Sequence, residues 1–254
     1  MGSLKKKERP SLESLVEIGD LGIEILHLGE LDITGELAEL CHIRKGTEVL
    51  DVATGTGESA CFLVQNYGCR VVGVDVSDYM VSRAVQKAQE RGLPIEFKKA
   101  DAHNLPFEDD TFDVAMSECT TCLLDKDRAI SEMVRVVKPR GYVGIHDICW
   151  KEDTPDEIKR KLVEIESERP ETLEGWKSLF AKAGLEEIVT LDRSSLIPGW
   201  EKEIRKKIGA VRQLKIFLKV IKSWGICGVK AVIESERIFQ GPHTGYGIIV
   251  GRKP

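Results

Sequence analysis

The sequence predicts an α/β fold, in which a mostly parallel sheet is covered by helices on both faces. Seven short apolar runs, most of them rich in valine and isoleucine, have the length of buried strands. Between most of them lie longer segments whose apolar residues recur at helical spacing. Strands that alternate with helices and are joined by short turns are typical of parallel sheets, because each crossover helix returns the chain to the same edge.

The expected elements follow one another in regular order from residue 48 onward. Strands are expected at 48–52, 70–76, 95–97, 112–117, 142–147, 186–191 and 245–250. Helices are expected at 58–67, 78–91, 126–137, 156–167, 173–183 and 201–222. Gly92 and Pro94 end the second of these helices, since both residue types stop a helix. One or two earlier helices are expected between residues 11 and 40.

The length of 254 residues suits one large α/β domain and is short for two independent ones. We expect an N-terminal helical cap at 1–44 and a main domain at 45–254, with a helical lid inserted at about 193–237. No apolar run reaches the roughly 18–20 residues that span a bilayer, and the basic start leads into no signal-peptide core. The sequence therefore predicts a cytoplasmic protein without a transmembrane segment.

A glycine-containing loop follows the first expected strand. Gly55 and Gly57 allow the backbone to adopt positive φ and to approach a ligand closely. The next helix begins at once, so its free N–H groups face the same space. Asp75 ends the second strand, where a carboxylate can accept hydrogen bonds from both hydroxyls of a ribose. Strand, Gly-x-Gly, helix, strand and acid at this spacing indicate a cofactor that contains a nucleoside.

The loop alone leaves two classes of cofactor open. Residues 55–60 also fit a dinucleotide fingerprint with Ala60 in the third glycine position, so an NAD(P)-dependent oxidoreductase is an alternative. Asp51 opposes it, because a carboxylate at the mouth of the strand repels a pyrophosphate but suits the cationic amino end of a methionine. No tyrosine has a lysine four residues later, so one common hydride-transfer pair is missing from the sequence.

Several motifs between residues 45 and 150 carry a resemblance to a known family. They lie at 49–57, 72–77, 100–107 with 110–114, and 135–141. In order and spacing they resemble the motifs of class I S-adenosylmethionine-dependent methyltransferases of the small-molecule type, in a style similar to quinone and sterol methyltransferases. Arg140 departs from the pattern, since many members have glycine there. The resemblance implies a Rossmann-like fold whose last strand is antiparallel to the rest.

The resemblance also implies which residues bind S-adenosyl-L-methionine. The glycine loop would pack against the cofactor, Asp75 would hold the ribose, and Asp101 would accept a hydrogen bond from the adenine amino group. Ser117 and Glu118 would line the methionine end. The full predicted set is Asp51, Ala53, Thr54, Gly55, Thr56, Gly57, Asp75, Val76, Met80, Asp101, Ala102, Ser117 and Glu118.

A methyl acceptor is expected above the carboxyl ends of the fourth and fifth strands. Methyl transfer is an in-line displacement, so alignment carries most of the catalysis and a general base is optional. The candidate catalytic residues are Glu118, Cys119, His146 and Asp147, with Cys122 and Trp150 near them in sequence. Each also has a plainer reading: Glu118 can seat the cofactor, His146 can face a helix, and Trp150 can belong to the core.

Seven cysteines, an odd number scattered along the chain, favour free thiols in a reducing compartment over a disulfide framework. Cys119 and Cys122 leave an arsenite methyltransferase open as a further alternative, since thiolates bind soft metalloids and that branch of the family uses cysteines. Two cysteines alone do not make a zinc site, which normally takes four ligands. No metal is therefore expected.

The stretch from residue 202 to residue 230 has nine basic residues and one acid, interleaved with apolar residues. It predicts a basic amphipathic lid that contacts an anionic or lipid-like small-molecule acceptor, or a membrane surface. The alternative is a helix with one buried face and one solvated basic face. Nucleic acid is not an expected partner, because the net charge is -5. A module that binds cofactor without turnover is a third functional reading, and the sequence identifies neither the acceptor nor the oligomeric state.

Overall fold

A computed structural model describes residues 28–254, and within them the chain divides into two compact units. The larger unit comprises residues 28–150, 170–196 and 245–254, and the smaller unit comprises residues 151–169 and 197–244. The first part of the predicted N-terminal cap, up to residue 27, lies outside the described residues. The predicted domain boundaries stay a prediction.

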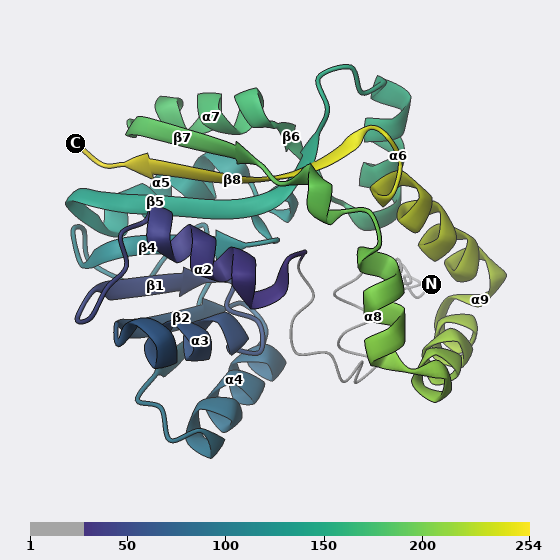
Figure 1. Cartoon of the computed structure of the whole chain (residues 1–254), viewed down its shortest axis with the longest axis horizontal. Helices are drawn as coiled ribbons and strands as arrows, with labels where there is room; N and C mark the ends of the chain where they lie inside the picture. Colours follow the sequence, from purple (N-terminus) through teal and green to yellow (C-terminus); the bar gives the residue numbers. More distant parts are fainter. Residues whose placement is uncertain (1–27) are drawn as a thin grey trace, which may run out of the picture. The chain divides into compact units, whose positions relative to one another are not determined.

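The sheet of the larger unit has the strand order β3-β2-β1-β4-β5-β8-β7 (Figure 1). These strands are β1 (Glu48–Val52), β2 (Arg70–Asp75), β3 (Glu96–Lys99), β4 (Phe112–Glu118), β5 (Val137–Trp150), β7 (Glu186–Asp192) and β8 (Thr244–Arg252). Strands β1 to β5 pair in parallel, and β7 pairs with β8 antiparallel. The predicted fold class is confirmed. The two-residue strand β6 (Glu171–Thr172), which the sequence did not predict, pairs with β5.

Helices cover both faces of this sheet (Figure 1). The elements α2 (Glu30–Leu40), α3 (Glu58–Tyr67) and α4 (Asp78–Glu90) contact one another in succession, and α5 (Lys126–Val136) contacts α7 (Leu173–Lys182). Side chains cap three of these helices: Ser77 accepts from the third residue of α4, Asp125 caps α5 and Thr172 caps α7. Their apolar faces close the core, in which Trp176 and Phe180 of α7 are fully buried.

Strand β5 begins at Val137, five residues before the predicted start at residue 142. The intervening residues belong to the strand, although its register with β4 shifts between the pair Phe112–Val137 and the pair Val114–Tyr142. Within it Arg140 has a φ of 69°, in the left-handed region that glycine favours. The family pattern of glycine at this position therefore has a backbone reason, and this chain holds an arginine in that conformation. A Cβ at Gly141 would lie 2.4 Å from the carbonyl oxygen of Asp113, so glycine is required there.

The smaller unit contains α6 (Asp156–Glu166), α8 (Trp200–Ile208) and α9 (Ala210–Phe239). Gly209 separates α8 from α9, and α9 is kinked at Gly225, whose φ is 68°. The helical stretch predicted at 201–222 is longer in the structure, where α9 continues past the kink at Gly225 to Phe239. Ion pairs join Lys161 to Glu234 and α8 to α9 within the unit. Among the described residues, no helix is long and apolar enough to cross a membrane.

Candidate active site

The loop between β1 and α3 forms the centre of the candidate site. Thr54 N donates to the carbonyl oxygen of Val74 at 2.9 Å, which ties the loop to β2. Ala53, Gly55 and Gly57 all have positive φ, at 61°, 55° and 75°. A Cβ built on Gly55 would meet nothing within 4 Å, so this backbone faces open space that a ligand can approach. A Cβ on Gly57 would lie 2.9 Å from side chains of α4 and β3, so that glycine serves close packing instead.

Two carboxylates stand at the carboxyl ends of the strands beside this loop. Asp75 Oδ2 accepts from Gly55 N at 3.0 Å, and its Oδ1 accepts from Ser77 N at 2.9 Å. Burial raises the pKa of Asp75, and the backbone hydrogen bonds oppose that rise. Asp51, buried in β1, accepts from Thr54 Oγ1 at 2.6 Å. Both carboxylates are thus held in fixed positions at the edge of the sheet where α/β folds bind their ligands.

The predicted adenine-binding residues lie at the ends of β2 and β3. Ala100 N donates to the carbonyl oxygen of Asp75 at 3.0 Å, which holds the following loop beside β2. Asp101 is exposed, and its Oδ1 accepts from His103 N at 2.9 Å, a bond that lowers the pKa of the carboxyl group. Val76 is 68% exposed although it is apolar, and Met80 lies on the first turn of α4. An exposed apolar side chain after β2 suits the flat face of a base, and an exposed carboxylate after β3 suits its amino group.

The end of β4 supplies a second set of polar groups. Ser117 pairs with Val52 of β1, and its hydroxyl is buried with no hydrogen-bond partner among the described residues. Buried hydroxyls usually have a partner, so this one suits a ligand atom. Glu118 Oε2 accepts from Ser59 Oγ at 2.5 Å and from Thr34 Oγ1 at 3.1 Å. Residues of α2 and α3 therefore hold the Glu118 carboxylate in place.

Three of the four candidate catalytic residues lie together. Glu118 pairs with His146 in the register of β4 and β5, and Glu118 Oε1 is 3.4 Å from His146 Nε2. On the other side of the ring, His146 Nδ1 is 2.5 Å from the hydroxyl of Tyr246 in β8. The same hydroxyl is 2.8 Å from Cys119 Sγ, and Cys119 Sγ is 3.7 Å from His146 Nδ1. We call Glu118, Cys119, His146 and Tyr246 the polar cluster.

Comparison with known proteins assigns a family to this architecture. Residues 49–141 match a family model described as a methyltransferase domain. The methyltransferase GfsG of Streptomyces halstedii is 32% identical over 234 residues, which cover 87% of this chain and 80% of that protein. The chain belongs to the S-adenosylmethionine-dependent methyltransferase family. The predicted family is confirmed.

Solved structures of similar proteins extend the comparison. This methyltransferase-family chain is 28% identical to the [4+2]-cyclase SpnF, with a TM-score of 0.72 over 87% of this chain and 80% of that one. A phosphoethanolamine N-methyltransferase 2 of Haemonchus contortus, in complex with S-adenosyl-L-methionine, shares the fold with a TM-score of 0.76 at 19% identity. That match covers 95% of this chain and 57% of the other. None of these relatives is an oxidoreductase, so the nicotinamide alternative has no support.

The matches cover only part of several other curated relatives. They span 33% to 60% of the length of four of them, three of which are phosphoethanolamine N-methyltransferases from Triticum aestivum and Arabidopsis thaliana.

Asp147, the fourth candidate catalytic residue, does not join the polar cluster. Its carboxylate accepts from Cys122 N at 2.9 Å and from its neighbour Ile148 N at 2.8 Å. Burial raises the pKa of Asp147 to about 6. The carboxylate thus fixes the short 3-10 turn Thr121–Leu123. Cys122 and Trp150 are buried too, so the structure places both in the core.

The sequence did not single out Tyr246, Ser59 or Thr34. Tyr246 stands between two glycines and is the one polar side chain of the predicted strand at 245–250, and this is the one local signal that could have marked it. Ser59 and Thr34 lie on helices where a hydroxyl is unremarkable in sequence. Their part in holding Glu118 depends on contacts across 59 and 84 residues of chain.

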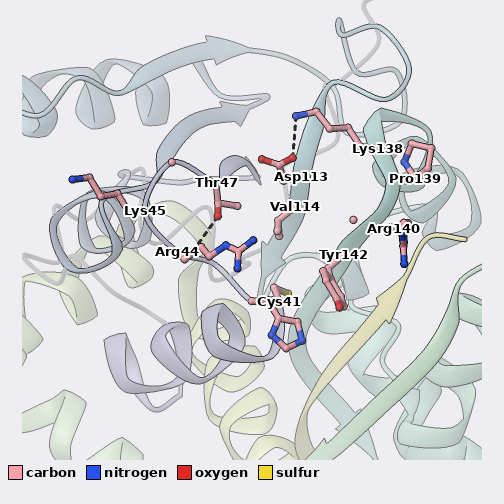
Figure 2. Close-up of a pocket in the computed structure, with 13 residues that line it drawn as sticks. Cys41, Arg44, Lys45, Thr47, Asp113, Val114, Lys138, Pro139, Arg140 and Tyr142 are labelled. Atoms are coloured by element: carbon pink, nitrogen blue, oxygen red, sulfur yellow. Dashed lines mark hydrogen bonds and ion pairs between the residues drawn. The ribbon is translucent and has the colours of Figure 1, made fainter.

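A hollow of about 670 Å³ opens elsewhere, at the amino-terminal ends of β1 and β4 (Figure 2). Arg44, Lys45 and Arg140 line it, and Lys138 in its wall pairs with Asp113 at 2.9 Å. None of the predicted cofactor-binding or catalytic residues lines this hollow. It lies outside the candidate active site.

Proposed function

We propose that this protein transfers the methyl group of S-adenosyl-L-methionine to a small-molecule acceptor. The observation that carries the proposal is the fixed pair Asp51 and Asp75 beside the open backbone of Gly55. Family membership supports it, and so does the bound S-adenosyl-L-methionine in the Haemonchus contortus relative.

The residues at this edge fit the chemical groups of the cofactor. In the proposal, Asp75 accepts from the ribose hydroxyls, Asp51 faces the cationic amino group, and Asp101 accepts from the adenine amino group. When bound, the cofactor supplies a methyl group activated by a positively charged sulfur. The chain then has to orient the acceptor in line with that methyl group and to exclude water, and such alignment can contribute about 7 to 11 kcal/mol.

Calorimetry with S-adenosylhomocysteine and with NAD tests the cofactor. We expect S-adenosylhomocysteine to bind and NAD not to bind. Binding of NAD alone would contradict the proposal. Asp75→Ala is expected to lower the affinity for either ligand, so that variant tests the position of the site and not the class of cofactor.

Transfer of a labelled methyl group tests the activity and the acceptor. The probes are phosphoethanolamine, on which the Haemonchus contortus relative acts by its name, and arsenite, which tests the alternative based on Cys119 and Cys122. A metabolite extract widens the search, with products identified by mass spectrometry. An anionic acceptor is proposed from the basic residues of α8 and α9.

Binding of the cofactor without methyl transfer is the second candidate function. It is favoured by the 28% identity to SpnF, which is named as a [4+2]-cyclase and not as a methyltransferase. Binding of S-adenosylhomocysteine without label transfer to any probe or extract component would support it. For the cellular location we propose the cytoplasm, because all seven cysteines are free thiols.

A further inference from the structure

We infer that Cys119, Tyr246 and His146 form a proton relay that removes the proton from the attacking atom of the acceptor, with Glu118 at its far end. The inference rests on the proposed methyl transfer and deepens it. It assigns the acceptor to the class whose attacking oxygen, nitrogen or sulfur carries a proton.

The order of the groups is set by their contacts. Glu118 Oε1 is 3.4 Å from His146 Nε2, within ion-pair distance although the two atoms are not hydrogen-bonded, and we place the ring proton on the nitrogen nearest that carboxylate. His146 Nδ1 is then the acceptor for the Tyr246 hydroxyl at 2.5 Å. The single hydroxyl proton of Tyr246 is thereby used, and in the proposed resting state the thiol of Cys119 takes the donor role in its contact with the Tyr246 oxygen, 2.8 Å away, where either atom can donate. The chain of hydrogen bonds therefore runs in one direction, from sulfur to imidazole.

Burial decides which end of the relay can meet an acceptor. His146 and Tyr246 are both 0% exposed, whereas Cys119 is half-buried. Cys119 is also held by its backbone, since its N–H donates to the carbonyl oxygen of His146 at 2.9 Å and its φ is 51°. Such a conformation is unfavourable for a non-glycine residue and is common at functional sites. The accessible end of the relay is thus a thiol fixed at the edge of the sheet.

The proposed step balances as follows. The attacking atom of the acceptor bonds to the methyl carbon as the carbon–sulfur bond of the sulfonium breaks and its electron pair stays on that sulfur. The acceptor proton passes to Cys119 Sγ, the thiol proton passes to the Tyr246 oxygen, and the phenol proton passes to His146 Nδ1. The imidazolium that forms is stabilised by the carboxylate of Glu118. After product release the proton returns to solvent by the same path.

The surrounding charges suit a relay through a neutral phenol. The Tyr246 hydroxyl contacts Cys119 and His146, and the carboxylates of Glu118 and Asp147 act on it through charge alone. Burial, the contact with Cys119 and the nearby carboxylates of Asp147 and Glu118 hold the pKa of Tyr246 well above its usual value. The phenol therefore keeps a proton that it can pass on. Ser59 and Thr34 both donate to Oε2 of Glu118, so the other oxygen, Oε1, is the one that lies toward His146.

Alkylation of Cys119 tests the relay without any methyl transfer. Cys227 is exposed and the other five cysteines are buried, so in a Cys227→Ser background iodoacetamide reports on Cys119. We expect Tyr246→Phe and His146→Gln to shift the pH profile of alkylation to higher pH and to slow it roughly tenfold at neutral pH, because the thiolate loses its proton acceptor. Tyr142→Phe, which removes a phenol from the same sheet, should leave the profile unchanged. An unchanged profile in Tyr246→Phe would overturn the relay.

Label transfer from S-adenosylmethionine to the same probes and metabolite extract adds the catalytic readout. Cys119→Ala and Tyr246→Phe should lower the single-turnover rate roughly 10²- to 10⁴-fold, the usual contribution of a general base. Cys119→Ser should restore most of it, and the affinity for S-adenosylhomocysteine should stay the same in all three. Equal rates in wild type and Cys119→Ala would overturn the inference. If wild type transfers no methyl group, the proposed function fails, and the alkylation profile still decides the relay.

Discussion

At the scale of single residues, Asp75 links the glycine loop to the end of β2 through two backbone hydrogen bonds. Asp75→Ala removes the carboxylate that we expect to bind the ribose. Hydrogen bonds to a charged group contribute about 1.5–3 kcal/mol each, so the affinity for S-adenosylhomocysteine should fall at least about tenfold. Calorimetry measures the change. The control variant is Asp110→Ala, which removes an exposed carboxylate outside the predicted cofactor site. Equal affinity in the two variants would remove Asp75 from the site.

Asp147 gives a prediction on pH dependence. Burial raises its pKa from 3.8 to about 6, so between these values the folded chain binds a proton that the unfolded chain has lost. The free energy of unfolding should therefore fall as pH rises from about 4 to about 6, by up to about 3 kcal/mol from this group. Urea unfolding of wild type and of Asp147→Asn, measured at several pH values, isolates the contribution of Asp147. All other carboxylates titrate in both proteins, so their effects cancel in the difference. A difference between the two proteins that is constant over this range would contradict the assignment.

The sequence could predict that Glu118, Cys119 and His146 lie near one another, because neighbouring parallel strands end at the same edge. It could not predict Tyr246, which meets His146 across 100 residues of chain. Nor could it separate Asp147 from the cluster by spacing alone. Successive residues of a strand point to opposite faces, and only the packed structure shows which face carries the polar groups.

At the scale of elements, the start of β5 holds Arg140 in a left-handed conformation. Arg140→Gly should stabilise the protein by about 1 kcal/mol, because glycine adopts positive φ without the steric penalty of a Cβ. The same change at Arg83, inside α4, should destabilise it by about 1 kcal/mol. Thermal or urea unfolding compares the two. If both substitutions destabilise equally, the backbone strain at Arg140 is negligible.

Helix α9 carries apolar side chains on its exposed surface. Val211, Leu214 and Leu218 are each more than half exposed, and basic residues lie between them. We expect binding to vesicles that contain phosphatidylserine, and the double change Lys215→Glu/Lys222→Glu should reduce it more than tenfold, since each cation contributes about 1 kcal/mol.

Sedimentation with vesicles measures this binding. The control is Arg44→Glu/Lys45→Glu, a double reversal in the hollow of Figure 2. If α9 is only a solvated basic helix, neither double variant will differ from wild type.

At the scale of the whole molecule, ligand binding should appear as thermal stability. S-adenosylhomocysteine at 100 times its Kd should stabilise the folded chain by about 2.7 kcal/mol, which for a chain of this size raises Tm by about 5–10 °C. Differential scanning fluorimetry reads this shift. NAD at the same concentration should produce none, and Asp75→Ala should lose most of the response to S-adenosylhomocysteine.

The fold could be predicted from the sequence because each strand and helix carries its own periodicity and end signals. The expected helix at 58–67 matches α3, and the expected strand at 48–52 matches β1. The sequence predicts an inserted helical segment at about 193–237, but it could not predict that residues 151–169 belong to one unit with residues 197–244, since no linker-like composition separates the units. Long-range assembly of this kind leaves no local pattern.

The place of β8 in the sheet has a consequence for synthesis. This strand comes after all the others in sequence, yet it lies between β5 and β7 and not at an edge. While the nascent chain still lacks β8, β5 and β7 each expose an unpaired side, and unpaired strand edges promote aggregation. On the ribosome the protein thus passes through a stage in which β7 still lacks its partner strand in the sheet, and we expect chaperones to bind it at that stage.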